Sequence, residues 1–473
     1  MAEAAADTAA AGCPVDGPGL FTREFVADPY PAYAHLRAHA PVHRTTLPSG
    51  VEAWLVTRYA DARQALADTR LSKNPRHSEQ AWKQGKVGVP GEQRSGIGAH
   101  LLNLDPPDHT RLRRLVSKAF TPRRAEDFRP RVQELTDRLI DGFAADGEAD
   151  LIHDFAFPLP IYAVCDLLGV PAADQDDFRT WAGMMIRHGS GPRGGVARAV
   201  RHMRGYLKDL IHRKRGDLGD DLISGLIRAS DHGEHLTEDE AAAMAFILLF
   251  AGFETTVNLI GNGLRTLLTH PDARARLTAD PDTRIGPAVE ELLRYDGPVE
   301  LATWRFTTVD TPIGGVVVPA GEPVLVVLAS ADRDGRRFPD ADTLDLERAD
   351  NQHLAFGHGI HYCIGAPLAR LEGQIAITTL LRRLPDLELA EPPGELRWRG
   401  GLIMRGLQRL PVRFTPEPGS ERSAPEPAGV RPGGARAGGR APGAGARGPR
   451  PRPGPPPPPP PPPDKKQKKN PHH

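Results

Sequence analysis

The sequence predicts a mainly α-helical fold with small β-sheets. A capping box, Thr237-Glu238-Asp239-Glu240, starts a stretch with no helix breaker until His270-Pro271, about 32 residues later. A helix of that length spans roughly 48 Å, and residues 241–253 are apolar on nearly all sides, so we expect it to cross the middle of the fold. The β-branched runs elsewhere are few and short, which limits the sheets to a minor part.

The N-terminal part alternates short helices and strands. Asp28-Pro29-Tyr30-Pro31 is a turn that leads into a short helix at residues 33–38, and Pro48-Ser49-Gly50 separates two short strands. The remaining predicted elements are the strands at residues 42–46 and 52–57 and a helix at residues 59–67. Residues 73–100 are rich in Gly, Pro, Gln and Ser, and a structureless loop of this length is usually functional.

The middle of the chain is helical. Asp105-Pro106-Pro107-Asp108 starts a helix that ends near Phe120. The pattern stays helical over residues 129–215, with breaks at Gly147, at Pro158-Leu159-Pro160 and at residues 189–195.

Beyond the long helix the pattern is mixed. A helix at residues 287–295 ends at Asp296-Gly297-Pro298. The β-branched runs 316–318 and 324–328, around Pro319-Ala320-Gly321, are expected to form a hairpin that extends the small sheet. An apolar turn, Gly401-Leu402-Ile403-Met404-Arg405-Gly406, comes shortly before the predicted end of the domain near Phe414.

Charge excludes some partners. The 60 basic and 60 acidic residues give a net charge of zero, so nothing global indicates nucleic acid or a membrane surface. The charge is uneven, because residues 416–473 carry 11 Lys or Arg and 4 Asp or Glu, which makes this tail +7 and the remaining chain −7. In the tail 29 of 58 residues are Pro or Gly, which predicts disorder with a polyproline II rod at residues 455–463.

Three cysteines, Cys13, Cys165 and Cys363, form no disulfide framework and indicate a reducing compartment. Cys13 is expected to be exposed, and Cys165 to lie in a helix core. The N-terminus lacks a signal-peptide pattern, and the run 241–253 is too short to span a bilayer. We therefore expect a cytoplasmic protein without a membrane anchor.

Cys363 lies in Phe356-Gly357-His358-Gly359-Ile360-His361-Tyr362-Cys363-Ile364-Gly365, directly before a predicted helix with Pro367 in its first turn. The helix dipole and unpaired N–H groups are expected to lower the pKa of the thiol and hold it as a thiolate. Gly359 and Gly365 allow tight bends and a close approach of the backbone to a flat ligand. The motif predicts a metal-bound thiolate, and the alternative is an inert, buried cysteine.

A polar group interrupts the long helix at Ala251-Gly252-Phe253-Glu254-Thr255-Thr256. An ionised Glu254 in an apolar helix is costly unless it has a partner or a function. The hydroxyl of Thr255 can bond a carbonyl one turn back and open the helix locally. The alternative is a solvated patch where the helix reaches the surface.

Two further pairs of candidate functional residues each share one face of a predicted helix. His109 and Arg113 share one face at i and i+4, although a solvated basic helix gives the same pattern. Glu291 and Arg294, at i and i+3, can form an ion pair about 70 residues before Cys363. By itself either spacing is common.

Together these motifs resemble the cytochrome P-450 family, in the family's order and over residues 20–415. The chain is most similar to the soluble bacterial, actinobacterial type. The resemblance implies the cytochrome P-450 fold, with haem b between the long helix and the Cys363 loop. Most bacterial relatives have Asn where this chain has Asp332, which puts the local turn chemistry in doubt.

The resemblance also implies roles for individual residues. Cys363 would be the axial iron ligand, and Glu254 and Thr255 an acid–alcohol pair that relays protons. Glu291, Arg294 and Arg348 would form a structural ion group. The implied haem-binding residues are His109, Arg113, Ala251, Gly252, Arg305, Phe356, Gly357, His361, Cys363 and Gly365. The implied pocket residues are Phe246, Leu249, Phe250, Leu301, Ala302, Ile403 and Met404.

The implied activity is insertion of one oxygen atom of O2 into a C–H bond of a mid-sized to large apolar substrate. A macrolide, other polyketide, terpenoid or steroid-like compound is expected. The sequence carries no flavin or nicotinamide motif, so electrons from NAD(P)H would arrive through a ferredoxin and its reductase. Arg111, Arg114 and Lys118 are candidates for the docking surface on an otherwise monomeric protein.

Other functions stay open. They are a broad xenobiotic oxidase, a thiolate-haem enzyme driven by peroxide or acting as a dehydratase, and a scaffold or sensor that works through its tail. The predicted organisation is an N-terminal arm at residues 1–19, a monooxygenase domain at residues 20–415 and a disordered tail at residues 416–473.

Overall fold

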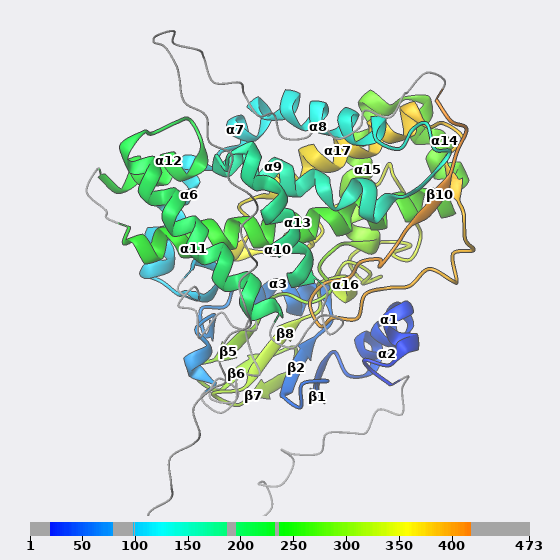
Figure 1. Ribbon diagram of the computed structural model, residues 1–473. Helices are drawn as coiled ribbons and strands as arrows, with labels where there is room; N and C mark the ends of the chain where they lie inside the picture. The colour runs from blue at the N-terminus through cyan, green and yellow to red at the C-terminus, as the bar shows by residue number, and fades with distance from the viewer. Residues whose placement is uncertain (1–18, 79–97, 99, 187–194, 232–235, 418–473) are drawn as a thin grey trace, which may run out of the picture. The chain divides into compact units, whose positions relative to one another are not determined.

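A computed structural model of the 473-residue chain describes residues 19–78, 98, 100–186, 195–231 and 236–417. These residues belong to one compact unit, Met1–Pro425. The predicted N-terminal arm with Cys13, most of the loop at residues 73–100, the Gly-rich break at residues 189–195 and nearly all of the tail lie outside the described residues. Figure 1 shows most helices gathered above a sheet that lies at the bottom of the view.

The larger sheet has five strands in the order β1-β2-β8-β5-β3. They are β1 (Val42–Thr46), β2 (Glu52–Val56), β3 (Leu71–Ser72), β5 (Arg305–Thr307) and β8 (Pro323–Val326). β1 and β2 are antiparallel with Val42 opposite Val56, whereas β2 and β8 are parallel with Trp54 opposite Val324. The two strands predicted at residues 42–57 are therefore confirmed.

The predicted hairpin of residues 316–318 and 324–328 is wrong. β7 (Val316–Val318) pairs with β6 (Thr311–Ile313), and β8 joins the larger sheet instead. The turn between β6 and β7 is Gly314-Gly315, and both residues have positive φ values, 53° and 87°. Such φ values suit a two-residue hairpin turn and are easy only for glycine. This turn was the stronger hairpin signal.

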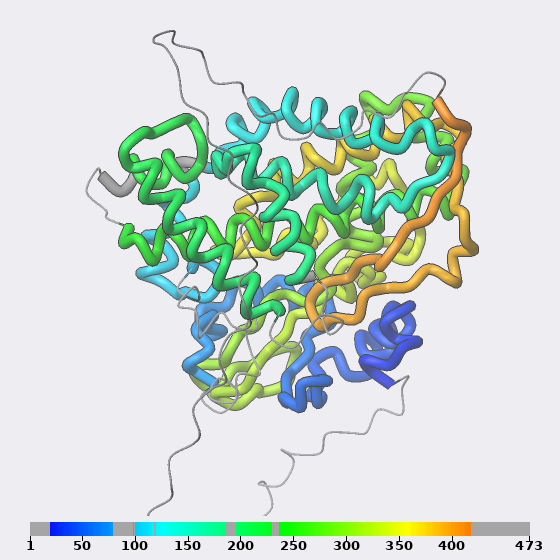
Figure 2. Tube along the Cα trace, in the orientation of Figure 1, coloured from blue at the N-terminus to red at the C-terminus, as the bar shows by residue number. Residues whose placement is uncertain are grey.

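A three-stranded sheet ties distant segments together in the order β4-β10-β9. β4 (Glu148–Asp150) follows the predicted break at Gly147, and β10 (Pro411–Arg413) is the last strand of the described chain. Pro411 lies opposite Asp150, and Val412 lies opposite Leu389 in β9 (Glu388–Leu389). Figure 2 shows this end of the chain in orange.

The α-helices of the described chain have the following bounds: α1 (Arg23–Ala27), α2 (Tyr30–His39), α3 (Tyr59–Ala67), α6 (Asp108–Ala119), α7 (Pro122–Asp127), α8 (Arg129–Asp141), α9 (Pro158–Leu168), α10 (Gln175–Ile186), α11 (Gly195–Gly216), α12 (Leu222–Asp231), α13 (Glu238–Thr269), α14 (Pro271–Ala279), α15 (Pro281–Asp296), α16 (Leu328–Ala331) and α17 (Ala366–Arg383). Short 3-10 turns are η1 (Pro75–His77), η2 (Leu101–Asn103), η4 (Ala172–Asp174) and η5 (Gly359–His361), and η3 (Leu151–Ala156) is a π-helical turn. α3 has its predicted bounds, and α15 begins earlier than expected with Pro287 inside it.

The predicted long helix is confirmed as α13, with 32 residues. Its N-terminus carries the predicted capping box, in which Thr237 Oγ1 accepts from Glu240 N at 3.1 Å and Glu240 Oε2 accepts from Thr237 N at 2.9 Å. Glycines let neighbouring elements pack closely, because a Cβ on Gly261 would lie 2.5 Å from Ile152 Cδ1. The helix passes through the centre of the helical layer in Figure 1.

Two helical stretches of the described chain, Leu151–Leu168 and Glu238–Thr269, are long and apolar enough to cross a membrane. The second extends beyond the run at residues 241–253 that we considered too short to do so. Most of each stretch is buried inside the fold, as in the core helix of a globular protein. Cys165 is fully buried in α9, as predicted.

Candidate active site

The loop that carries Cys363 is held by its backbone. Cys363 N donates to Phe356 O at 3.0 Å, which closes the loop around η5. Gly359 has a φ of 76°, and a Cβ there would lie 2.9 Å from Leu66 O of α3. Gly357 also has a positive φ of 73°. These two positions therefore need glycine, and the close approach at Gly359 is to protein backbone.

Gly365 differs from the expectation. Its φ of −83° is open to any residue, so the bend does not require glycine. A Cβ there would lie 3.9 Å from Cys363 Sγ, so glycine keeps one side of the thiol clear. α17 begins at the next residue with Pro367 in its first turn, as predicted.

The Cys363 thiol is partly exposed, and the predicted lowering of its pKa is wrong for the protein chain alone. Burial raises the pKa of Cys363, and hydrogen bonds from Gly365 and Ala366 together with the charge of Arg113 act in the opposite direction. The N–H groups at the helix start are thus present as predicted. They are outweighed by the loss of solvent around the buried sulfur, which disfavours the thiolate.

Basic side chains gather on one side of this loop. The rings of His109 and His361 lie 4.3 Å apart between their centroids. Burial and the nearby charges of Lys73, Arg305 and Arg113 lower the pKa of His361 to about 2. Burial likewise lowers the pKa of Arg305 to about 10, with Asp105 acting in the opposite direction. The structure therefore brings together His109, Arg113, Arg305 and His361.

The carboxylate of Asp105 acts on Arg305 and His109 of this basic cluster, but it forms an ion pair with neither Arg113 nor Arg305. Within the described residues, neither Arg113 nor Arg305 forms an ion pair, and the buried Nε2 of His109 has no hydrogen-bond partner. Unpaired buried cations are costly, so the cluster fits an anionic group that the protein chain does not supply. Lys73, which our sequence analysis missed, lies in the same cluster at 3% exposure. Its sequence signal was its position as the first residue of the loop at residues 73–100, which we expected to be functional.

One face of α13 is exposed in the middle of the helix, although most of the helix is buried. Ala251 is exposed, and Leu248, Phe250, Gly252 and Thr255 are partly exposed. Leu249, Phe253 and Glu254, which lie between them in the sequence, are buried. Thr255 Oγ1 donates to Ala251 O at 2.8 Å, and Thr256 Oγ1 to Gly252 O at 3.0 Å. These bonds to carbonyls one turn back are the ones that the sequence predicted.

The pocket residues divide into two sets. Phe250 is partly exposed, whereas Phe246 and Leu249 are 1% and 2% exposed and belong to the hydrophobic core, not to the open face. Leu248, which our sequence analysis did not name, is partly exposed, and its spacing of three and seven residues from Ala251 and Thr255 gives it the same helix face.

A second wall comes from the C-terminal turn. Glu300 N donates to Ile403 O at 2.8 Å, and Val299 forms a β-bridge with Met404. Ile403 and Met404 are partly exposed, while Leu301 and Ala302 are buried at 1% and 8% exposure. The turn at residues 401–406 thus lies beside residues 299–302, and the turn side is the more open of the two.

Glu254 is 3% exposed and points to the side of α13 that carries Asn258, one turn later. Arg399 donates to Asn258 Oδ1, and burial lowers the pKa of Arg399 while the charge of Glu254 raises it. A Cβ on Gly406 would lie 2.7 Å from Arg399 Nη2, so glycine makes room for this guanidinium. Arg399 was not identified from the sequence.

Glu372 of α17 is a second buried acid near the site. Burial raises the pKa of Glu372 to about 8, and a hydrogen bond with Thr256 of α13 lowers it. Its Oε2 has no partner among the described residues. No sequence signal separated this residue from other acids.

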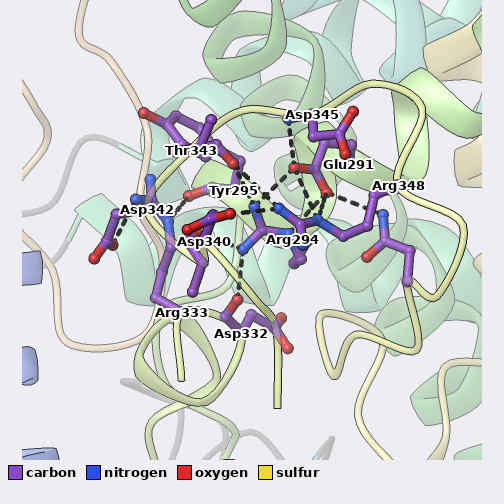
Figure 3. A network of polar contacts seen from close by, with 12 residues as sticks. Glu291, Arg294, Tyr295, Asp332, Arg333, Asp340, Asp342, Thr343, Asp345 and Arg348 are labelled. Atoms are coloured by element: carbon purple, nitrogen blue, oxygen red, sulfur yellow. Dashed lines mark hydrogen bonds and ion pairs between the residues drawn. The ribbon is translucent and has the colours of Figure 1, made fainter. Parts of the chain in front are cut away.

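Figure 3 shows the group formed by Glu291, Arg294 and Arg348. Arg294 Nε and Nη2 each donate to the Glu291 carboxylate at 2.7 Å, and Arg348 Nε donates to it at 3.2 Å. Arg294 also donates to the carbonyl oxygens of Asp332, Ala341 and Thr343. The three predicted members are therefore in contact and fasten the segment that leads to the Cys363 loop.

The same segment is linked to α17. Arg370 donates to both oxygens of Glu290 at 2.7 and 2.8 Å and stacks over Phe356, 4.5 Å from the ring centroid. Asp332 Oδ1 accepts from Leu354 N at 2.6 Å, and burial raises the pKa of Asp332 to about 6. The loop that presents Cys363 is thus fixed from both ends.

These features fit haem. The basic cluster supplies cations for its propionates, Cys363 supplies one thiol with N–H groups beside it, and α13 opens at Ala251 and Gly252. The thiol and the unpaired cations belong to one site because the charge of Arg113 acts on Cys363.

Comparisons with known proteins agree with this geometry. Residues 192–394 match the model of the family described as Cytochrome P450. The chain belongs to the cytochrome P450 family and is a haem-thiolate monooxygenase that uses O2 and electrons from NAD(P)H. It is 50% identical over 404 residues to "Cytochrome P450 monooxygenase PikC" of Streptomyces venezuelae, covering 85% of this chain and 94% of that protein.

Two further relatives are informative. The chain is 43% identical over 383 residues to "Mycinamicin IV hydroxylase/epoxidase" of Micromonospora griseorubida, covering 80% of this chain and 94% of that protein. The solved structure of the Bacillus subtilis 168 "Bacillaene Polyketide Synthase (PKS) Cytochrome P450 PksS" superposes with a TM-score of 0.77 at 38% identity, covering 84% and 99% of the two chains. The predicted family, its bacterial type and the fold class are confirmed.

Proposed function

We propose that this monooxygenase hydroxylates or epoxidises a mid-sized to large apolar product of secondary metabolism, of macrolide or other polyketide, terpenoid or steroid-like type. The observation that supports this most is the open face of α13, where Leu248, Ala251 and Gly252 offer no charge. The partly exposed Ile403 and Met404 add a second apolar wall. The names of the mycinamicin IV hydroxylase/epoxidase and of the bacillaene polyketide synthase cytochrome P450 PksS support the polyketide part of this substrate class.

In this proposal Cys363 binds the haem iron, and His109, Arg113, Arg305 and His361 hold the propionates. Arg is suited to a carboxylate because its N–H groups form a fork. Ala251, Gly252, Phe356, Gly357 and Gly365 leave room for the flat ring. When bound, the haem with its thiolate ligand supplies the dioxygen chemistry and the insertion of oxygen into the substrate.

Glu254 and Thr255 are our candidates for proton delivery. The Thr255 hydroxyl proton is held on Ala251 O at 2.8 Å, on the open face of α13. Glu254 is buried on a neighbouring face, next to the charge of Arg399. A carboxyl group that is shielded from bulk water and an adjacent hydroxyl can pass a proton into the active site without admitting bulk water.

Replacing the hydroxyl tests this assignment. We expect Thr255→Val to reduce product formed per NAD(P)H about tenfold or more, because proton delivery fails and electrons are lost to peroxide. Thr269→Val is the matched control, since Thr269 Oγ1 bonds Arg265 O at 3.0 Å at the far end of the same helix. Equal coupling in both variants would contradict the role of Thr255.

Substrate screening by the spin-state shift of the haem Soret band tests the function itself. We expect macrolide and polyketide-like compounds to shift the band, and polar compounds of equal size to leave it unchanged. Cys363→Ser should lose the thiolate signature of the reduced carbon-monoxide complex. A colourless protein after expression with ample haem, or a normal spectrum in Cys363→Ser, would refute the proposal.

Bacterial members of this family take electrons from redox partners, and we propose a ferredoxin with its NAD(P)H-dependent reductase here. Arg114 is exposed, whereas Arg111 is engaged in an ion pair with Glu240 and the side chain of Lys118 lies outside the described set. The docking surface predicted from these three residues therefore rests mainly on Arg114. We further propose a cytoplasmic monomer.

Two alternatives stay testable. A broad xenobiotic oxidase would give spin-state shifts with unrelated small compounds. A peroxide-driven enzyme would turn over with peroxide as well as with ferredoxin and reductase, and the presence of both Glu254 and Thr255 argues against it.

A further inference from the structure

Arg405 is a buried arginine at the base of the turn whose residues Ile403 and Met404 form the second wall of the proposed pocket. Its side chain is 4% exposed, and its Nε donates to the Asp296 carboxylate, which is 3% exposed, at 2.7 Å. Burial raises the pKa of Asp296, but the charge of Arg405 and hydrogen bonds from Arg405 and Tyr30 outweigh it, so the pKa is lowered and the pair is ionised. A buried ion pair rarely adds stability over apolar residues, so stability alone does not account for this one.

The rest of the Arg405 guanidinium is bonded to α1. Its Nη1 donates to Val26 O at 3.1 Å and its Nη2 to Ala27 O at 3.3 Å, at the C-terminal end of that helix. The guanidinium also lies over the ring of Trp398, with Cζ 3.7 Å from the ring centroid. Each nitrogen of the planar guanidinium therefore has an acceptor, and together these bonds fix the position of the side chain.

The backbone of Arg405 is fastened as well. Arg405 N donates to Pro298 O at 3.0 Å. Asn262 of α13 donates from its Nδ2 to Arg405 O at 3.0 Å and to Asp296 O at 3.2 Å. Asp296 is the last residue of α15, so the base of the turn is joined to α13, to α15 and, through the side chain, to α1.

The apolar wall lies directly next to this anchored residue. Ile403 O accepts from Glu300 N at 2.8 Å and from Leu301 N at 3.3 Å, while the side chains of Ile403 and Met404 are partly exposed. Met404 is the chain neighbour of Arg405, so a shift of Arg405 would carry both apolar residues with it. The position of the wall therefore depends on where Arg405 holds the base of the turn.

We propose that Arg405 is a positioning residue for substrate binding, whose guanidinium fixes the turn at residues 401–404 and thereby sets how far Ile403 and Met404 extend into the pocket. This inference rests on the proposed function, in which these two side chains line the pocket. It assigns Arg405 no contact with the substrate. A wall that is already in place needs no ordering when a ligand binds, so it favours large apolar ligands that reach it and leaves small ligands unaffected.

The test uses the haem-loaded full chain and two azoles whose imidazole nitrogen binds the iron and shifts the Soret band. Imidazole itself needs only the space beside the iron, whereas clotrimazole adds bulky aromatic rings that extend into the pocket. We expect Arg405→Lys, which keeps the charge but loses the fork of donors, to raise the dissociation constant of clotrimazole about fivefold or more. The dissociation constant of imidazole should stay within about twofold of its value for the unmodified protein.

Two further variants separate the causes. Asn262→Ala loosens the same base of the turn from α13, so it should weaken clotrimazole binding in the same direction but by less. Arg37→Lys is the matched control, because Arg37 is also a buried arginine, at 8% exposure, and its Nη1 donates to Ser330 O at 3.1 Å and to Ser330 Oγ at 3.0 Å. Arg37→Lys should leave the dissociation constants of both azoles unchanged. Melting temperatures show that each variant is folded.

A double-mutant cycle with Met404→Ala shows whether Arg405 acts through the turn. Met404→Ala shortens the wall and should by itself raise the dissociation constant of clotrimazole. If Arg405 acts by placing Met404, the double variant should lose less affinity than the product of the two single losses, because the two changes remove the same contact.

The inference is overturned if Arg405→Lys and Asn262→Ala both keep the ratio of the two dissociation constants within about twofold, or if the losses of Arg405→Lys and Met404→Ala multiply. It is equally overturned if Arg37→Lys changes the ratio as much as Arg405→Lys, because the effect would then reflect general destabilisation. Clotrimazole binding that Met404→Ala leaves unchanged would instead refute the pocket of the proposed function, and failure of the unmodified protein to bind haem would refute that function altogether.

Discussion

At the scale of single residues, the buried carboxyl group of Asp332 makes the stability of the protein depend on pH. Asp332 is 2% exposed and accepts from Leu354 N at 2.6 Å, in the segment that leads to Cys363. Burial raises the pKa of Asp332 from 3.8 to about 6, and His353 and Leu354 N lower it only partly.

This shift makes stability depend on pH. The folded pKa lies above the unfolded one, so the folded state favours the protonated acid, and the stability this group contributes is lost as pH rises from about 4 to about 6. We expect Asp332→Asn, which keeps the acceptor oxygen, to raise the free energy of unfolding at pH 7 by up to about 3 kcal/mol and to change it little at pH 4.

Urea unfolding of the haem-loaded protein at pH 4 and pH 7 measures the effect. Asp340→Asn, at an exposed position of the same segment, serves as the control. An equal gain at both pH values would show that the charge of Asp332 is not its cause.

At the scale of elements, the loop between residues 356 and 365 depends on its contact with α3. Gly359 has a φ of 76° and approaches the Leu66 carbonyl so closely that a Cβ would lie 2.9 Å from its oxygen. We expect Gly359→Ala to destabilise the protein by about 1–3 kcal/mol and to weaken haem retention, because backbone rather than a flexible side chain blocks the methyl group.

Gly335→Ala provides the comparison, since no atom lies within 4 Å of its Cβ position. Thermal unfolding and haem transfer to apomyoglobin measure both variants. Equal melting temperatures of the Gly359→Ala and Gly335→Ala proteins would mean that the loop can shift away from α3.

Helices with clear start and stop signals in the sequence could be predicted, whereas the pairing of β-strands could not. The capping box at Thr237 and the His270-Pro271 stop gave α13 its bounds, because both act within a few residues of the chain. The pairing of Val316–Val318 depended on a choice between neighbours on either side, and the Gly314-Gly315 turn decided it. Likewise the open face of α13 follows from its packing, which is why Leu248 was missed and Phe246 was misplaced.

The same limit applies to the site. A motif places Cys363 before a helix, but only the surrounding atoms determine that burial outweighs the N–H groups in its pKa. Lys73 and Arg399 come from segments far from any motif, and their contacts with Thr303 and Asn258 exist only in the folded chain. Residues within a motif were thus predictable, and those that support it were not.

At the scale of the whole molecule, the ion pair of Glu291 and Arg294, which are both fully buried, connects α15 to the segment that leads to the Cys363 loop. A buried ion pair rarely adds stability over apolar residues, but losing one partner leaves an uncompensated charge. Here Arg294 places its bonds on three backbone carbonyls as well as on Glu291 (Figure 3), so it fixes where the chain passes behind the Cys363 loop. Its contribution is therefore to position that segment.

The last contacts among the described residues extend the folded domain beyond the predicted boundary. Glu417 N donates to Ala144 O at 2.9 Å, and Arg383 Nε donates to Glu417 Oε1 at 3.1 Å. These contacts lie beyond residue 415, where the sequence placed the boundary. We propose that the working domain extends through Glu417 and that the Pro-rich tail is dispensable.

Two truncations test this boundary. A chain that ends at Pro425 should keep the melting temperature, the haem spectrum and substrate oxidation, because it retains Glu417. A chain that ends at Thr415 loses the partly exposed Arg383–Glu417 pair and should melt about 1–3 °C lower with oxidation unchanged. If the longer truncated chain lost oxidation, the tail would belong to the working enzyme, and a scaffold or sensor role for it would regain support.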